Sequence, residues 1–405
     1  MNATPRGNRL HIALLGRRNA GKSSLINALT NQDIAVVSSI PGTTTDPVYK
    51  AMEILPLGPV TIIDTAGIDD EGELGQLRVR KSLDILNKAD LVLLVIDAVD
   101  GVTSFEKDIV RRCQEKNLPV SIVLNKSDLQ PVSSAQLEQV KEQLGVMPVV
   151  TSALTGSGIA ELKIAMINSA PSRWDEQTIV GDLLHPGDVA VLVVPIDMAA
   201  PKGRLILPQV QTIRDILDHD AMAYVTKEHE LEECLLTLSK KPRIVITDSQ
   251  AFLKADAATP PDVLLTSFSI LFARYKGDLE TLVAGARAIE NLQAGDKVLI
   301  AEACTHHRME DDIGTVKIPR WLRQTVGGEL NFEWCSGNRF PDDLSAFKLV
   351  VHCGGCMINR REMLSRIAQV QAAGVPIVNY GVCIAYVMGI LKRALSPFPL
   401  LQERL

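Results

Sequence analysis

The sequence predicts an α/β protein in which a P-loop domain is followed by a small α/β domain and a doubly wound α/β domain. Three observations support this fold class. Apolar runs of strand length recur along the chain, and helix-like segments follow many of them. One of these runs leads into a glycine-rich loop at residues 16–23. The length of 405 residues exceeds what one core usually supports, so we expect domains of about 100–200 residues each.

The composition excludes several classes of protein. Hydrophobic residues make up 46% of the chain, but no apolar run reaches the ~18–20 residues of a membrane-spanning helix. The formal net charge of -6, without clustered Lys and Arg, disfavours a general nucleic-acid binder. The polar N-terminus runs directly into a strand, so we expect no signal peptide and a cytoplasmic location. Seven cysteines, an odd number, indicate a reducing compartment and metal binding more than disulfides.

The glycine-rich loop has the pattern G-x-x-x-x-G-K-S between a strand-like run at 11–15 and a helix-like segment at 24–29. In this context the backbone N–H groups wrap the β-phosphate, Lys22 neutralises the β and γ oxygens, and the Ser23 hydroxyl is placed to bind Mg²⁺. We therefore expect a nucleotide site that includes Gly16, Asn19, Ala20, Gly21, Lys22, Ser23 and Ser24.

Further strand-like runs end at the remaining motifs of a nucleotide switch. Residues 60–63 lead to Asp64, which can hold Mg²⁺ through water, and the Gly67 N–H can sense a γ-phosphate. A buried-strand run at 91–96 precedes another at 120–124, which ends at Asn-Lys-Ser-Asp.

That last segment resembles the guanine-specificity motif of the GTPase family. The resemblance implies that Asp128 accepts both guanine N–H donors, Asn125 supports the base edge and Lys126 packs over the ring. A second segment resembles the loop whose backbone amide meets the guanine oxygen; it consists of Ser152, Ala153 and Leu154. We therefore expect GTP and GDP as ligands, because ATP would leave Asp128 without its donors.

Two details resemble the branch that includes the tRNA-modification GTPase and the ribosome-assembly GTPases. Residues 42–46, Gly-Thr-Thr-Thr-Asp, look like its switch I, with Thr44 favoured as a Mg²⁺ ligand among three adjacent threonines. Ile68 stands where Ras-like enzymes have a catalytic glutamine. The resemblance implies that Asn19 helps to bind a K⁺ ion; the alternative is a loop residue bonded to its own backbone. The expected catalytic group is Lys22, Asn19, Thr44, Asp64 and Gly67.

A small α/β segment follows the P-loop domain. The polar stretch at 171–181 favours a linker, and Ala-Ala-Thr-Pro-Pro at 257–261 favours a second boundary. Between them, strand and helix patterns alternate without a catalytic constellation, at 188–195, 209–218, 221–226, 231–238 and 243–247. The predicted domains are therefore residues 1–172, 173–260 and 261–405.

The C-terminal third concentrates residue types that bind metals. A Cys-Thr-His segment at 304–306 is followed, after 45 intervening residues, by His-Cys-Gly-Gly-Cys at 352–356. Strand-like runs at 297–301 and 347–351 precede the two segments. Because the carboxyl ends of parallel strands converge on one crevice, we expect the segments to meet. Three cysteines with two histidines could form an incomplete Cys₄-type cluster or a mixed zinc site.

The other cysteines have simpler expected roles. Cys113, Cys234 and Cys383 lie in helix-like runs, so we expect them to be buried as small hydrophobic residues. Cys335 lies in a predicted loop, where it is a disfavoured spare ligand.

The combination of GTP-binding motifs with this cysteine pattern closely resembles the FeFe-hydrogenase maturation GTPases, the HydF family, along the whole chain. The resemblance implies a GTPase domain, a dimerisation domain and an iron-sulfur-cluster domain. It implies a 4Fe-4S cluster held by Cys304, Cys353 and Cys356, with His306 and His352 near the cluster as possible ligands.

The same resemblance implies a scaffold or carrier role for a homodimer. Such a protein receives a transient di-iron precursor, assembled with two radical-SAM maturases, and delivers it to the apo FeFe-hydrogenase. Slow GTP hydrolysis would act as a switch for partner interaction. The chain has no Cys-x₃-Cys-x₂-Cys motif, so we do not expect radical chemistry from it.

Two alternatives stay open at this point. The switch I pattern would also suit an RNA- or ribosome-associated GTPase with a structural metal site, although the acidic charge counts against it. A zinc-dependent hydrolase with a regulatory GTPase domain would need a general base, and no Glu or Asp is obviously placed as one.

Overall fold

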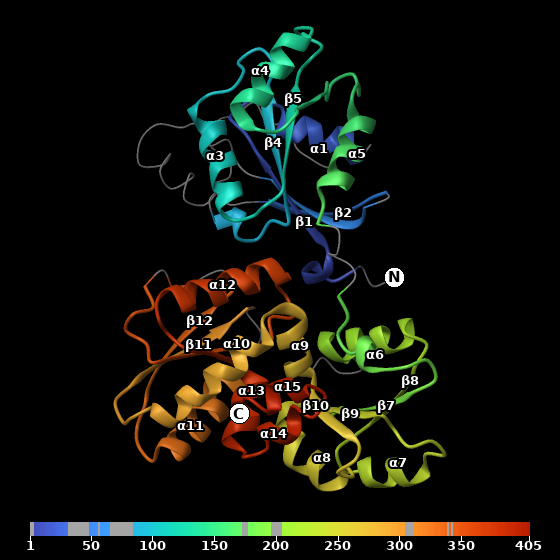
Figure 1. The fold of residues 1–405 in the computed structure, drawn as a ribbon, viewed down its shortest axis with the longest axis vertical. Helices are drawn as coiled ribbons and strands as arrows, with labels where there is room; N and C mark the ends of the chain where they lie inside the picture. Colours follow the sequence, from blue (N-terminus) through green and yellow to red (C-terminus); the bar gives the residue numbers. More distant parts are fainter. Residues whose placement is uncertain are drawn as a thin grey trace. The chain divides into compact units, whose positions relative to one another are not determined.

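The described part of the chain is organised around three β-sheets, each with helices on its faces (Figure 1). A computed structural model describes residues 4–30, 48–55, 57–64, 84–171, 177–195, 205–303, 312–337, 340–341 and 343–405. The contacts divide the chain into two units, residues 1–176 and residues 177–405. The expected linker lies at this division, and residues 172–176 are outside the described ranges.

The first unit contains a six-stranded sheet in the order β2-β3-β1-β4-β5-β6. Only the pair β2 and β3 is antiparallel; the other described pairs are parallel. The strands are β1 (Leu10–Leu15), β2 (Val48–Ile54), β3 (Gly58–Asp64), β4 (Leu91–Asp97), β5 (Val120–Asn125) and β6 (Val149–Val150). The strand-like runs predicted at 11–15, 60–63, 91–96 and 120–124 are confirmed as β1, β3, β4 and β5.

Helices cover both faces of this sheet, which explains why its central strands β1, β4 and β5 are buried at nearly every position rather than at alternate positions. The helices are α1 (Lys22–Thr30), α3 (Ser104–Glu115), α4 (Ser134–Leu144) and α5 (Ile159–Ser169). Along β1, Ile12 and Leu14 face a core shared with α1 and α5, whereas Ala13 and Leu15 face a core shared with α3 and α4. Cys113 is buried in the second core, as expected.

The second unit begins with a parallel four-stranded sheet in the order β10-β9-β7-β8. Its strands are β7 (Val189–Val193), β8 (Met222–Thr226), β9 (Ile244–Thr247) and β10 (Leu264–Ser267), and its helices are α6 (Leu207–Asp218), α7 (Leu231–Thr237), α8 (Phe252–Ala258) and α9 (Phe268–Lys276). The expected boundary at residue 260 is wrong for this sheet, because β10 lies beyond it and pairs with β9. The Pro-Pro pair at 260–261 belongs to the turn between α8 and β10.

The third sheet is also parallel, in the order β12-β11-β13-β14. Its strands are β11 (Lys297–Glu302), β12 (Asn331–Ser336), β13 (Leu349–His352) and β14 (Ile377–Asn379). The helices after α9 are α10 (Leu279–Ala284), α11 (Ile318–Val326), α12 (Arg360–Ala372), α13 (Tyr380–Val387), α14 (Leu391–Ala394) and α15 (Pro399–Gln402). The first strand lies inside the sheet and the chain continues to both sides of it, so the doubly wound prediction is confirmed.

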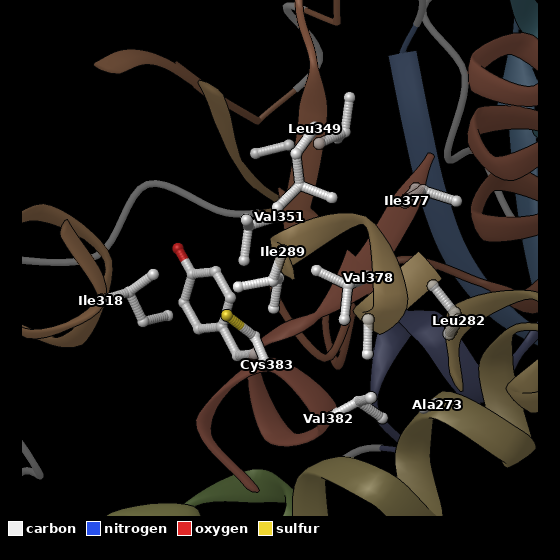
Figure 2. Close-up of a cluster of buried hydrophobic side chains, with 14 of the residues drawn as sticks. Ala273, Leu282, Ile289, Ile318, Leu349, Val351, Ile377, Val378, Val382 and Cys383 are labelled. Atoms are coloured by element: carbon white, nitrogen blue, oxygen red, sulfur yellow. The ribbon is translucent and has the colours of Figure 1, made fainter. Parts of the chain in front are cut away.

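Helix α9 packs against the cores of both sheets of the second unit. Ile270 and Ala273 belong to the core of the third sheet, whereas Leu271 and Phe272 belong to a core of the second sheet. Figure 2 shows part of the third-sheet core, including Cys383, which is buried as expected. The shared helix explains why residues 177–405 form one unit. Among the described residues, no helix has the length and apolar character needed to cross a lipid bilayer.

Candidate functional site

The P-loop lies between β1 and α1, and the close approach of its backbone to neighbouring strands requires glycine. A Cβ atom at Gly16 would lie 2.3 Å from the Val95 carbonyl oxygen, and one at Gly21 would lie 2.2 Å from Asn125 Nδ2. Helix α1 begins at Lys22, so Ser23 and the residues around it present a helix N-terminus, which is a ready site for phosphate. The loop therefore has the backbone geometry that its motif predicts.

Lys22 and Asp64 bring opposite charges to this loop. Lys22 is buried, and its Nζ donates to the Gly16 carbonyl at 2.7 Å and to the Arg17 carbonyl at 2.8 Å. Asp64 ends β3 and is paired in register with Leu14 of β1. Burial raises the pKa of Asp64, while the charges of Lys50 and Lys22 oppose that rise. A carboxylate in this position is suited to face a cation such as Mg²⁺.

Asn19 adopts a left-handed backbone conformation with φ of 61°, which asparagine tolerates better than most residues. Its predicted role in K⁺ binding is not tested by this geometry. The predicted residues Thr44 and Gly67 lie outside the described residues, as does Ile68.

The residues of the predicted guanine motif meet the P-loop directly. Asn125 Nδ2 donates to the Ala20 carbonyl at 3.0 Å, and Asn125 Oδ1 accepts from the Ala153 N–H at 3.0 Å. The Ser152 hydroxyl donates to Asp128 Oδ1 at 2.5 Å. Leu154 is 83% exposed beside this loop. The structure therefore brings together the described residues that were predicted to bind phosphate and guanine.

Three charged residues beside this site, Arg17, Asp97 and Glu106, were not predicted. Lys126 Nζ donates to Asp97 Oδ2 at 2.7 Å, and Arg17 Nε donates to Glu106 Oε1 at 3.0 Å. One signal was visible in the sequence: Thr103 and Glu106 have the spacing of a capping box, which the structure shows at the start of α3. The pairing of Glu106 with Arg17 could not be inferred, because the two residues are 89 positions apart in the sequence.

The cysteine motif lies at the carboxyl end of the third sheet. Strands β11 and β13 are neighbours, with Ala301 opposite His352, and the Cys353 N–H donates to the Ala301 carbonyl at 2.9 Å. The Ala303 N–H donates to Cys353 Sγ at 3.1 Å. Ala303 is the residue before Cys304 in the sequence; Cys304 and His306 themselves lie outside the described residues.

The turn from Cys353 to Cys356 depends on glycine, since Gly355 has φ of 65°. Cys356 packs at the edge of the core formed by β7, β9 and α9. Burial raises the pKa of the Cys353 thiol, whereas backbone N–H donors from Ala303 and Gly355 act in the opposite direction. Such N–H donors stabilise a bound thiolate.

His352 is placed beside the cysteines as predicted, but both of its ring nitrogens are hydrogen bonded. The side chain is fully buried, with Nδ1 2.7 Å from the Cys353 carbonyl and Nε2 3.2 Å from Arg366 Nη1. Because an arginine only donates, Nε2 accepts and Nδ1 carries the proton. Burial, together with the Arg366 charge, lowers the pKa of His352 to about 3. The side chain would have to give up one of these bonds to become a direct ligand.

The donor set fits thiolate ligation as far as the structure describes it. Cys353 and Cys356 lie on one tight turn, and N–H groups are directed at the Cys353 sulfur, a chemistry suited to an iron-sulfur cluster. Within the described ranges, no group of three or more His, Cys, Asp or Glu side chains is placed to hold a metal ion. The ligand set expected here includes Cys304, which those ranges omit.

The remaining cysteines of the third sheet are less suited to act as thiolates. Burial raises the pKa of Cys335 to about 11 and that of Cys383 to about 12. Cys335 lies in β12 opposite Ala301, rather than in the loop that the sequence predicts. A strand position fixes its side chain more firmly than a loop would.

Three family models match the chain. Residues 11–126 match a model described as 50S ribosome-binding GTPase. Residues 179–277 match the hydrogen maturase F dimerization domain, and residues 280–397 match the hydrogen maturase F tetramerization domain. Together the last two models match more than half of the 405 residues.

Individual relatives match the N-terminal part. The tRNA modification GTPase MnmE of Nitrosomonas europaea is 37% identical over 162 residues, which are 40% of this chain and 35% of the relative. GTPase Der of Mycoplasmopsis pulmonis is 34% identical over 187 residues, which are 43% of each chain. The chain thus spans less than half the length of these relatives. A crystal structure of Aquifex aeolicus Era bound to GDP and aluminium fluoride is 20% identical, with a TM-score of 0.37, and covers 54% of this chain and 93% of that one.

Proposed function

The chain belongs to the hydrogen maturase F family, and we propose that it is a GTP-binding scaffold that carries a 4Fe-4S cluster and the di-iron precursor of the FeFe-hydrogenase active site. In this proposal it receives the precursor, assembled with two radical-SAM maturases, and delivers it to the apo-hydrogenase. GTP hydrolysis at the N-terminal GTPase domain acts as a switch for partner interaction.

The observation that carries the cluster proposal is the contact between the ends of β11 and β13. The Ala303 N–H reaches Cys353 Sγ at 3.1 Å, although the two residues are 50 positions apart in the sequence. Since the next residue after Ala303 is Cys304, the sequence puts a third thiol directly after the strand end that contacts Cys353. This supports Cys304, Cys353 and Cys356 as one ligand set.

A cluster bound by three thiolates would offer one iron for an exchangeable ligand, which suits a carrier. The described residues around the motif supply a fixed setting for it. Arg366 is buried and donates to the Glu362 carboxylate at 2.9 Å and to the Gly337 carbonyl at 2.7 Å, besides its contact with His352. We propose that these contacts hold His352, and through it the carbonyl of Cys353, in one orientation. His352 then supports the ligand loop rather than binding iron.

A chain of hydrogen bonds connects the first described residues of the second unit with the start of α12. Ile179 is among the first described residues after the GTPase unit, and its carbonyl accepts from Arg274 Nη2 of α9 at 3.0 Å. The carbonyl of Arg274 accepts from Arg360 Nη1 at 3.1 Å. Arg360 also donates to two further carbonyls at the end of α9 and begins α12, shortly after Cys356. These bonds tie the segment at Ile179 to the carboxyl end of α9 and to the start of α12, which follows the cysteine loop in the sequence.

The matched dimerization and tetramerization domains imply that the protein forms oligomers. We propose the edge of the second sheet as the dimer surface. Strand β8 lies at that edge, and Tyr224 and Val225 are 44% and 49% exposed. Among the described strands β8 has a neighbour on one side only, and an apolar edge strand of this kind is suited to pair with a second copy of itself.

Anaerobic purification with iron, sulfide and zinc analysis, followed by electron paramagnetic resonance of the reduced protein, tests the proposal. We expect about four irons per chain, and loss of this iron in Cys304→Ala, Cys353→Ala and Cys356→Ala. Cys113→Ala is the matched control, because this thiol is buried in the GTPase domain. One zinc per chain with no cluster signal would refute the proposal and favour the zinc alternative.

The alternative of an RNA- or ribosome-associated GTPase rests on the N-terminal part of the chain, where the ribosome-binding model matches residues 11–126. The hydrogen maturase F models match residues 179–277 and 280–397. The protein can be crosslinked to its partners in cells that also contain the hydrogenase and then purified. Recovery of specific RNA would favour this alternative. Recovery of the apo-hydrogenase without RNA would support the maturation role.

A further inference from the structure

Arg17 is the second residue of the P-loop, and its guanidinium is bound to the turn after β4. Its Nε donates to Glu106 Oε1 at 3.0 Å, and its Nη2 donates to the Gly101 carbonyl at 2.9 Å. A third group, the Asp100 carboxylate, lies 3.7 Å from Nη1. The side chain is therefore engaged by one short segment of the chain, roughly 85–90 residues away in sequence.

The Glu106 carboxylate accepts other hydrogen bonds besides the one from Arg17, and these hold it in place. It is fully buried, and its Oε2 accepts from the Thr103 N–H at 2.7 Å and from the Thr103 hydroxyl at 2.6 Å. The bond from the Thr103 N–H belongs to the capping box that starts α3. A buried carboxylate held in this way gives a strong, directional bond to a guanidinium, and it would be left under-satisfied without one.

The same turn holds the guanine motif at its other end. Asp97 Oδ2 accepts from Lys126 Nζ at 2.7 Å, and Asp97 Oδ1 accepts from the Val99 N–H at 2.9 Å. The Gly101 N–H donates to the Asp97 carbonyl at 3.0 Å and closes the turn. Residues 97–101 are thus bonded to Lys126 of the base-binding loop and to Arg17 of the phosphate-binding loop.

We propose that the turn at residues 97–101 is a brace that sets the spacing between the phosphate loop and the guanine loop, with Arg17 and Glu106 as positioning residues for nucleotide binding. GTP and GDP must contact both loops at once, so a fixed spacing lowers the cost of ordering them on binding. The brace also reaches the lysine predicted to bind the phosphates, because the Arg17 carbonyl accepts from Lys22 Nζ at 2.8 Å.

The brace makes Arg17 a positioning residue and not a catalytic arginine. Its guanidinium bonds point to Glu106 and Gly101, so it would have to leave a buried carboxylate to reach a γ-phosphate. GTP and GDP share the guanosine and the first two phosphates. A positioning role therefore predicts equal losses of affinity for both nucleotides, whereas a catalytic role predicts a loss in turnover.

The test compares Arg17→Gln, Glu106→Gln and Asp97→Asn with the unaltered full chain. Dissociation constants for fluorescent GDP and a non-hydrolysable GTP analogue are measured together with kcat at saturating GTP. We expect both dissociation constants to rise by the same factor in Arg17→Gln and Glu106→Gln. That factor should be about tenfold, equivalent to about 1.4 kcal/mol, with kcat within about twofold. Arg17→Lys should recover part of the loss.

Combined variants test the brace itself. Arg17 and Asp97 act through one turn, so Arg17→Gln and Asp97→Asn together should weaken binding less than the product of their separate effects. Fully independent effects would overturn the brace and leave two unrelated local contacts.

Arg111→Gln is the matched control. It breaks an exposed pair with Glu115 on the same helix and should leave binding unchanged. Binding stoichiometry gives the active fraction, so a general loss of folded protein is separated from weaker binding. Two results would refute the proposal: a fall in kcat with unchanged affinity, which indicates a catalytic arginine, or a lower active fraction with unchanged affinity, which indicates a purely structural pair.

Discussion

Replacing Asp128 by asparagine should change the preferred base, and the structure explains in which orientation the new amide would lie. The Ser152 hydroxyl donates to Asp128 Oδ1 at 2.5 Å, so that oxygen position is fixed as an acceptor. In Asp128→Asn the amide oxygen should take this position, which directs the NH₂ group towards the base. A guanine presents N–H donors to that group, whereas a xanthine presents an oxygen acceptor in place of one of them.

The size of the change follows from the bonds that are lost. Two hydrogen bonds to a charged group contribute about 1.5–3 kcal/mol each. Their removal should therefore weaken GDP binding about 10²–10⁴-fold. Xanthosine diphosphate should bind more tightly to the variant than GDP does, because its oxygen accepts from the new NH₂ group.

The assay is competition of GDP and xanthosine diphosphate against one fluorescent nucleotide, with the unaltered protein measured in parallel. Adding Ser152→Ala to Asp128→Asn provides the orientation control. Without the Ser152 hydroxyl the amide can turn over, so the preference for xanthine should shrink in the double variant. A GDP dissociation constant within threefold of the unaltered value in Asp128→Asn would refute the assignment of this residue to the base.

Three further predictions concern the metal ions and the oligomer. GTP hydrolysis should be faster in K⁺ than in Na⁺. The variant Asn19→Gly should abolish this difference, because glycine tolerates the left-handed backbone but lacks the side-chain amide. A variant that still responds to K⁺ would exclude Asn19 from the ion site. Cys335→Ala and Cys383→Ala should keep the cluster, and imidazole should alter its electron paramagnetic resonance spectrum; loss of iron in either variant would indicate a closed four-cysteine centre instead. The variant Val225→Lys puts a charge on the exposed edge of β8 and should shift sedimentation towards smaller species. Its GTP affinity should not change. An unaltered oligomer would place the dimer surface elsewhere.

The sequence was most informative where local chemistry decides the structure. The P-loop was predictable because its motif requires glycine at positions 16 and 21, where the structure leaves no room for a Cβ atom. The strand before it was predictable because the largely apolar run at 11–15 is buried. The cysteine pair was predictable for a similar reason, since the turn between Cys353 and Cys356 requires a left-handed residue that Gly355 supplies. In each case the constraint lies within a few neighbouring residues.

The errors and omissions of the sequence analysis arise where the structure depends on contacts between residues that are distant in the sequence. The Pro-Pro pair at 260–261 correctly indicated a turn, but a turn does not reveal which sheet the next strand joins, and β10 joins β9. His352 has the residue type of a metal ligand, yet its partner Arg366 comes from α12 and could not be inferred from the motif. The bond between Arg17 and Glu106 likewise depends on the order of β1 and β4 in the sheet.

Helix α9 connects the proposed cluster loop on the third sheet with the proposed dimer surface on the second sheet. Its residues Leu271 and Phe272 pack into the core of the second sheet, whereas Ile270 and Ala273 pack into that of the third. The carbonyl groups at its carboxyl end accept from Arg360, at the start of α12. Cys356 packs against the second-sheet core as well. Because closely packed interiors transmit small displacements, an oligomer contact on the second sheet and the cysteine loop on the third would respond to the position of the same helix.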